Sequence, residues 1–292
     1  MGKMIKRQRI TTRIKKAHQA WKDFRAYEVV SRRLNQSIAT DKFFLTENVA
    51  YGEHERQNFD LYRAVSSRQD RALIVFVHGG TWARGDKSDY AFVAESFTQD
   101  GFDVLVLNYR LAPQHRFPDY VSDLIHAVNY LHAQQQELSI STENLVLMGH
   151  SAGAFNIMSA LYHKDAQDVF DGIDQIKAVI GLAGPYHFNY ANDKNLQQAF
   201  PVDKHYKQIM PYYFVTQNQI QHLLLIAELD LIVASQNSKD MHYALCRAGN
   251  QSVLERVPYA GHISLVGSLS SRFSHYFATK RLILNYLNRI LG

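Results

Sequence analysis

The chain has 292 residues, 46% of them hydrophobic and 20% charged, a composition typical of a globular protein whose core needs no covalent cross-links. A single cysteine, Cys246, excludes an intramolecular disulfide and a multi-cysteine zinc site, and it predicts a reducing, cytoplasmic location. The formal net charge of +5 raises the question of a nucleic-acid or membrane partner, so the distribution of this charge has to be examined first.

The positive charge is concentrated at the N-terminus. Residues 1–33 contain eleven basic residues against Asp23 and Glu28, whereas the rest of the chain has a net charge of −4. Apolar side chains recur here at the spacing of one helix face, which predicts a basic amphipathic helical arm over residues 1–40. The apolar stripe consists of Ile10, Ile14, Ala17, Trp21 and Phe24.

Three roles are open for this arm. A surface helix that docks its apolar stripe on the protein body is the first, and a helix lying on an anionic membrane surface is the second. Nucleic-acid binding is the third, but no zinc-finger, RNP or helix-turn-helix motif accompanies the charge, and we expect no nucleic-acid partner. The arm is not a secretory signal, because basic residues interrupt its apolar runs.

The remaining chain, residues 41–292, shows the pattern of one α/β domain. Two alternating segments, Phe43–Tyr51 and Phe59–Tyr62, predict an antiparallel strand pair. Continuous apolar runs then alternate with helical stretches, which predicts a mostly parallel, doubly wound sheet with helices on both faces. The further strands are predicted at Ala72–Val77, Val104–Leu107, Leu145–Met148, Ile176–Ala183, Leu223–Ala227 and Val253–Val257. The helices are predicted at Tyr90–Phe97, Tyr120–Leu131, Ala154–Leu161 and Val233–Ala248.

One long segment, about residues 185–221, fits neither pattern. It is rich in aromatic and polar residues and has little periodicity. Because long irregular segments inside compact domains usually serve function, we expect a small cap over the carboxyl edge of the sheet.

The strongest chemical signal is Gly149-His150-Ser151-Ala152-Gly153, between a predicted strand and a predicted helix. Glycines on both sides of a serine allow the tight strand-turn-helix that exposes the hydroxyl at the start of the helix. We therefore predict that Ser151 is a nucleophile.

A serine nucleophile requires a base, and the base requires an orienting carboxylate. Downstream of Ser151, one strand ends in Glu228-Leu229-Asp230 and a later strand is followed by Gly261-His262. Since the carboxyl ends of parallel strands share one edge, we predict His262 as the base and Asp230 as the acid. Glu228 is the rival acid, although it lies closer to the strand.

A third element, His78-Gly79-Gly80-Thr81-Trp82, follows another strand at the same edge. Paired glycines let the main chain approach a substrate carbonyl, and each N–H group aimed at the developing oxyanion contributes roughly 3–4 kcal/mol. We predict that the N–H groups of Gly80, Thr81 and Ala152 form an oxyanion hole.

Five segments together resemble the esterase branch of the α/β-hydrolase superfamily, with hormone-sensitive-lipase-like carboxylesterases and kynurenine-formamidase-like hydrolases as the nearest groups. The segments are HGGTWARGDK at 78–87, NYRLAPQHRFP at 108–118, GHSAGA at 149–154, GPYHF at 184–188 and GHISL at 261–265. The resemblance implies an α/β-hydrolase fold and hydrolysis of esters or formamides with no cofactor and no metal. Thr81 replaces a third glycine of the lipase-like pattern, and His187 replaces an aspartate common in related esterases.

We accordingly expect a serine hydrolase that cleaves carboxylic esters of small to medium acyl groups through an acyl-enzyme. An arylformamidase or amidase and a membrane-recruited lipase are the alternatives, and a non-catalytic ligand-binding relative is disfavoured by the intact triad. Trp82 and Tyr186 are candidates to line the acyl pocket, and Arg110 is expected to pair with Asp123. The expected partner is a small-molecule ester or formamide, with peripheral membrane contact left open; the oligomeric state is not readable from the sequence.

Overall fold

The computed structural model describes residues 26–36, 38–163 and 170–292. Within them lies one eight-stranded sheet with the order β1-β2-β4-β3-β5-β6-β7-β8. The strands are β1 (Phe43–Ala50), β2 (Asn58–Ala64), β3 (Leu73–Val77), β4 (Asp103–Leu107), β5 (Leu145–His150), β6 (Ile176–Leu182), β7 (Gln221–Ala227) and β8 (Ser252–Val257). Strand β2 is antiparallel to both of its neighbours, and the pairings from β4 to β8 are parallel. The predicted mostly parallel sheet and its antiparallel N-terminal pair are confirmed.

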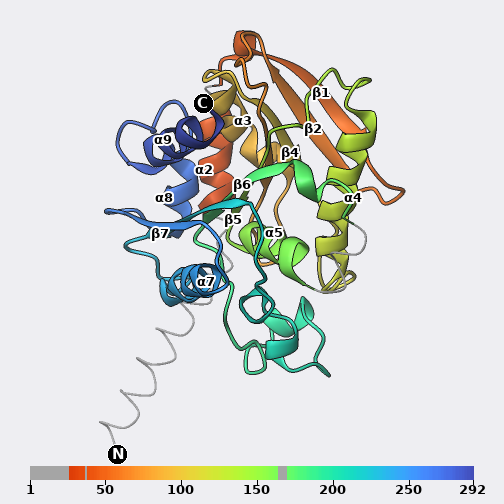
Figure 1. Cartoon of the computed structure of the whole chain (residues 1–292), viewed down its shortest axis with the longest axis vertical. Coiled ribbons are helices and arrows are strands. Elements are labelled where there is room, and N and C mark those ends of the chain that lie inside the picture. Colours follow the sequence, from red (N-terminus) through yellow and green to blue (C-terminus); the bar gives the residue numbers. More distant parts are fainter. Residues whose placement is uncertain (1–25, 37, 164–169) are drawn as a thin grey trace, which may run out of the picture.

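Helices cover both faces of this sheet (Figure 1). They are α2 (Ala26–Asn35), α3 (Ala91–Thr98), α4 (Asp119–Gln134), α5 (Ala152–Tyr162), α7 (Gln236–Arg247), α8 (His262–Gly267) and α9 (Thr279–Leu291). The sheet residues alternate between the two faces, as the period of two in a strand requires. Side chains such as Val75 and Leu105 pack with α4, α5 and α7, whereas Ile74 and Val104 pack with α3, α8 and α9. Two apolar cores therefore bury the central strands completely.

Most of the predicted arm, including its apolar stripe, lies outside the described residues. The part that is described forms helix α2, which lies against α3 and α8. Leu34 joins the core on that face, while the Asn35 side chain bonds the Ser88 carbonyl at 2.7 Å and the Phe92 N–H at 3.0 Å. The C-terminal end of the predicted arm is therefore docked on the body.

The predicted cap segment, residues 185–221, consists of loops and three short 3-10 helices (Leu196–Gln198, Tyr206–Gln208 and Pro211–Tyr213) before β7 begins. It extends the molecule beyond α5 and α7 (Figure 1). Phe200 and Met210 are fully buried against α4 and α5, so this segment shares the main core.

Candidate active site

A sharp turn between β5 and α5 presents Ser151. Its backbone has φ +53° and ψ −119°, a conformation that residues other than glycine rarely adopt. Its N–H donates a 2.9 Å hydrogen bond to the Leu182 carbonyl on β6. A Cβ on Gly153 would collide with the Val77 carbonyl, and one on Gly149 would lie 2.6 Å from the backbone of α5. The two glycines thus have the steric role that the motif predicts.

The structure brings His262 and Asp230 together beyond the ends of β8 and β7. The Nδ1 atom of His262 lies 2.7 Å from Oδ2 of Asp230, and both side chains are more than nine-tenths buried. The other carboxylate oxygen accepts the N–H groups of Ile232 and Val233 at 2.8 and 2.9 Å. With Asp230 ionised, Nδ1–H of His262 donates a hydrogen bond to the carboxylate, which leaves Nε2 as the acceptor on the opposite side of the ring.

The environment keeps Asp230 ionised. Burial alone would raise the pKa of Asp230, but the hydrogen bond and charge of His262 and the N–H groups of Val233 and Ile232 outweigh it, so its pKa falls below the ordinary value. The rival Glu228 accepts the Tyr259 N–H at 3.0 Å instead. The geometry therefore selects Asp230 as the partner of His262.

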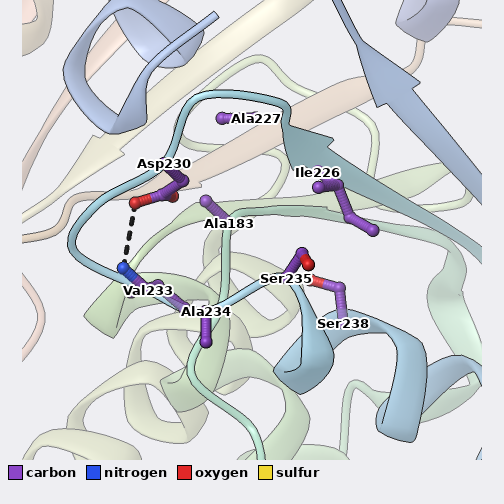
Figure 2. A pocket seen from close by; sticks show the side chains of 8 residues that line it. All are labelled: Ala183, Ile226, Ala227, Asp230, Val233, Ala234, Ser235 and Ser238. Carbon is purple, nitrogen blue, oxygen red and sulfur yellow. Dashed lines mark hydrogen bonds between the residues drawn. The ribbon is translucent and has the colours of Figure 1, made fainter.

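A narrow hollow borders Asp230 (Figure 2). Figure 2 shows Asp230 on the loop that leaves β7, with its carboxylate turned toward Val233. Ala183, after β6, and Ser235 and Ser238, at the start of α7, close the other sides. The hollow has no room for a water-sized sphere, so it cannot hold a substrate.

His150 contacts the predicted base. The His150 and His262 ring centroids lie 4.7 Å apart, and Nε2 of His150 is 3.1 Å from the His262 carbonyl. Burial is the main cause that lowers the pKa of His150 to about 3, and the charge of His262 adds to it. His150 is therefore neutral near pH 7, and its Nε2–H donates to that carbonyl. The sequence reasoning gave His150 no role, although its place directly before Ser151 was the available signal.

The loop after β3 holds Gly80 and Thr81 in left-handed backbone conformations, with φ +125° and +53°. Among the described residues, the N–H groups of these two residues donate no hydrogen bond within the protein. Ala152 is the first residue of α5, where a backbone N–H has no intrahelical acceptor. The loop also lies against Ser151, because a Cβ on Gly79 would be 3.1 Å from the Ser151 Cβ.

Trp82 and Tyr186 lie in the core. Trp82 is 1% exposed, donates from Nε1 to the Asn156 side chain at 2.8 Å, and packs edge-on against Phe200. Tyr186 is fully buried, with its hydroxyl against Gly181 on β6. Both side chains thus have a packing role, and their role in an acyl pocket stays a prediction.

Two further polar contacts bear on the sequence motifs. Arg110 forms the expected ion pair with Asp123 at 2.7 Å. His187 lies between two partners: Nδ1 is 2.6 Å from Oδ2 of Asp240 on α7, and Nε2 is 2.8 Å from the Tyr213 hydroxyl. The sequence contained no signal for these two partners of His187, because they lie 26 and 53 residues away.

Within the described residues, no helix is long and apolar enough to cross a bilayer, and no group of three histidine, cysteine or acidic side chains has the geometry to hold a metal ion.

The fold and the arrangement at its carboxyl edge define the protein as an α/β-hydrolase. A model of the BD-FAE family matches residues 59–245, and the chain belongs to that family.

The relatives at sequence level include kynurenine formamidases and methylesterases. A kynurenine formamidase from Salmo salar is 25% identical over 229 residues, which are 76% of each chain, and one from Danio rerio is 26% identical over 81% of this chain and 80% of its own. A probable isoprenylcysteine alpha-carbonyl methylesterase from Arabidopsis thaliana is 30% identical over 48% of this chain and 34% of its own. Among solved structures, esterase B from Lactobacillus rhamnosis (HN001) superposes with a TM-score of 0.75 at 14% identity, covering 95% of both chains. That last likeness shows the fold.

Proposed function

We propose that Ser151 is the nucleophile of this hydrolase, that His262 is its general base and that Asp230 orients the base. The observation on which this depends is the buried 2.7 Å contact between His262 and Asp230, at the same sheet edge as the strained turn of Ser151. The N–H groups of Gly80, Thr81 and Ala152 are proposed to stabilise the oxyanion.

The reaction would proceed by acyl transfer in two halves. Nε2 of His262 takes the Ser151 proton as Oγ attacks the acyl carbon, and the protonated imidazole then gives this proton to the leaving alcohol or amine. Water enters and attacks the acyl carbon as His262 removes a proton from it, and His262 then returns this proton to Ser151 Oγ as the bond to the acyl carbon breaks and the acid leaves. Asp230, whose pKa is lowered, stays ionised and stabilises the imidazolium in both halves.

The proposed substrates are carboxylic esters of small to medium acyl groups, and formamides are the second candidate class. The two kynurenine formamidases are similar over most of this chain, which supports the formamide alternative. A panel of nitrophenyl esters of increasing acyl length and an N-formyl aryl amine, assayed on wild type and Ser151→Ala, separates them. We expect the highest kcat/KM on short esters. A higher kcat/KM on the formamide would replace the ester assignment, and no turnover on either substrate would favour the non-catalytic, ligand-binding alternative.

Peripheral contact with a lipid surface is a further proposal. Four large apolar side chains are exposed next to the catalytic acid and the base: Leu229, Leu231, Ile232 and Tyr259, with Leu231 92% exposed. Exposed apolar side chains beside an active site suit an amphiphilic ester, and the basic residues at 1–33 would add attraction to anionic headgroups. We place the protein in a reducing, cytoplasmic compartment, where the exposed thiol of Cys246 would stay reduced.

Liposome co-sedimentation tests this contact. The full chain should sediment with phosphatidylserine vesicles and be released by salt, and Leu231→Ser with Ile232→Ser should weaken binding several-fold. Val202→Ser, at an exposed apolar position in the predicted cap, is the matched control and should bind as wild type. Equal binding of all three proteins, or none by the wild type, would exclude the proposed contact.

A further inference from the structure

A buried polar network lies behind the loop that follows β3. Lys87 is 7% exposed, and its Nζ atom is 2.5 Å from Oδ1 of Asp60 on β2 and 2.8 Å from the Asn48 side chain. Asp60 also accepts the Asn48 N–H at 2.8 Å. A buried ammonium is tolerated only when it is paired in this way, so Lys87 fixes its own backbone to the β1–β2 hairpin.

Arg56 joins the same loop to the end of β4. Its Nη2 donates to the Gly85 carbonyl at 2.9 Å, and its Nε donates to the Tyr109 carbonyl at 2.8 Å. Asn108 completes the connection: its Nδ2 donates to Asp86 at 2.9 Å, and its Oδ1 accepts the backbone N–H of Lys87 at 2.8 Å. Three segments that are distant in sequence are thus held together by side chains outside the triad.

Gly85 transmits this arrangement to the oxyanion loop. It has φ +101°, and a Cβ there would lie 2.6 Å from both the Gly79 carbonyl and the His78 ring. Gly79 in turn lies against Ser151. Gly85 therefore packs against the start of the loop that carries Gly80 and Thr81.

We propose that Arg56, with Lys87 and Asp86, is a positioning residue for the oxyanion hole. This inference depends on the proposed function, because it assigns the network to the same two N–H donors. These side chains would act on the transition state through the backbone of Gly85 and would leave substrate binding nearly unchanged. Since loss of one oxyanion donor costs about 10²- to 10³-fold in kcat, a displaced loop should cost about 10- to 100-fold.

The surface at this place allows a chemical-rescue test. The network borders a hollow of about 320 Å³ that is open to solvent and is lined by Arg56, Asp86, Lys87 and Asn108, among others. In Arg56→Ala, a methylguanidinium ion can enter from this hollow and donate to the carbonyls that the side chain has left. Arg68→Ala is the matched control, because the Arg68 and Arg56 side chains are equally exposed and each pairs with an aspartate. Arg68 lies before β3, at the amino ends of the parallel strands, away from the loop that follows β3.

The experiment measures kcat, KM and melting temperature on a short ester. We expect Arg56→Ala to lose about 10- to 100-fold in kcat with KM changed less than about threefold, and millimolar methylguanidinium to restore much of the loss. Arg68→Ala should keep the wild-type kcat and show no rescue. A wild-type kcat in Arg56→Ala, an equal loss in both variants, or a loss that methylguanidinium does not reverse would overturn the inference. Turnover that survives in Ser151→Ala would instead overturn the proposed function.

Discussion

At the scale of single residues, the carboxylate of Asp230 is held by three donors: His262 on one oxygen and the N–H groups of Ile232 and Val233 on the other. In an asparagine at this position, the NH2 group would replace one carboxylate oxygen and would face an N–H group that needs an acceptor. If this N–H group belongs to His262, the imidazole is left in the wrong tautomer. The role assigned to Asp230 therefore depends on its charge and not only on its shape.

We expect Asp230→Asn to lower kcat by about 10⁴-fold, because the imidazolium loses its counter-charge, while the circular dichroism spectrum is retained. Glu228→Gln is the control on the same loop, since Glu228 bonds the Tyr259 N–H and not the base. It should keep kcat within about twofold. A large loss in Glu228→Gln together with a small one in Asp230→Asn would exchange the two roles.

The sequence was informative about the residues to which we assign the chemistry and less so about those that we propose support them. Ser151, Asp230 and His262 were predicted because each stands in a short motif at a strand end. Arg56 has no motif, and its partners come from the ends of three segments that only the folded chain brings together. Side chains that act through long-range contacts leave no local pattern, so a single sequence does not reveal them.

At the scale of elements, the segment proposed as a cap is fastened to α7 by one histidine. The His187 side chain pairs with Asp240 and Tyr213 and stacks on Tyr212 with ring centroids 4.2 Å apart. The backbone N–H of His187 donates to the side-chain oxygen of Asn237 at 2.9 Å. Because these contacts join the chain after β6, the 3-10 helix Pro211–Tyr213 and α7, they determine how firmly the segment is held.

His187→Ala should loosen this segment and lower the free energy of unfolding by about 1–3 kcal/mol, since it removes the hydrogen bonds that two partially buried side chains, Asp240 and Tyr213, make to the imidazole. Hydrogen–deuterium exchange should rise in residues 206–214 and stay unchanged in β5. Val202→Ala, an exposed position in the same segment, serves as the control. Unchanged exchange in His187→Ala would mean that packing of Phe200 and Met210 alone holds the segment.

Most strands and helices were predicted where their apolar residues follow a regular pattern, and the conformation of the irregular segment was not. The apolar runs located the central strands to within a few residues, because a strand buried on both faces has no polar positions. Helix α9 was not predicted, although Ile283, Tyr286 and Leu287 repeat at helical spacing and are buried. The segment 185–221 had no period to interpret, since its conformation depends on contacts between distant rings such as Trp82 and Phe200.

At the scale of the whole molecule, three buried histidines connect stability to pH. Burial is the largest cause that lowers the pKa of His78 to about 4, of His150 to about 3 and of His222 to about 4. In the unfolded chain a histidine titrates near pH 6.5. Between about pH 6.5 and 4 the unfolded chain therefore binds protons at these positions while the folded protein does not, and acid favours unfolding.

The free energy of unfolding should fall below pH 6.5, with a slope that approaches about 4 kcal/mol per pH unit near pH 5 if all three histidines contribute. Urea denaturation at several pH values measures this slope. Replacement of His222, which bonds the Tyr162 hydroxyl far from the triad, by glutamine should reduce the slope by about a third; replacement of the exposed His275 should not. A stability that is constant from pH 7 to pH 5 would contradict neutral burial of these side chains.

The charge of the chain is divided unevenly between the N-terminal residues and the rest of the molecule. The positive balance of the chain belongs to residues 1–33, and the hydrolase body is mildly acidic. Nothing in the triad or the oxyanion loop requires a basic surface, so the charge bears on where the protein docks and not on which bond it cleaves.

The central claim is that Ser151 is the nucleophile, and covalent labelling tests it most directly. Incubation with a serine-reactive organophosphate, followed by intact-mass and peptide mass spectrometry, should give one adduct on Ser151 and a proportional loss of esterase activity. Ser151→Ala should take up no label and lose about 10⁴- to 10⁶-fold in kcat. Label on another residue, with turnover retained in Ser151→Ala, would contradict the account.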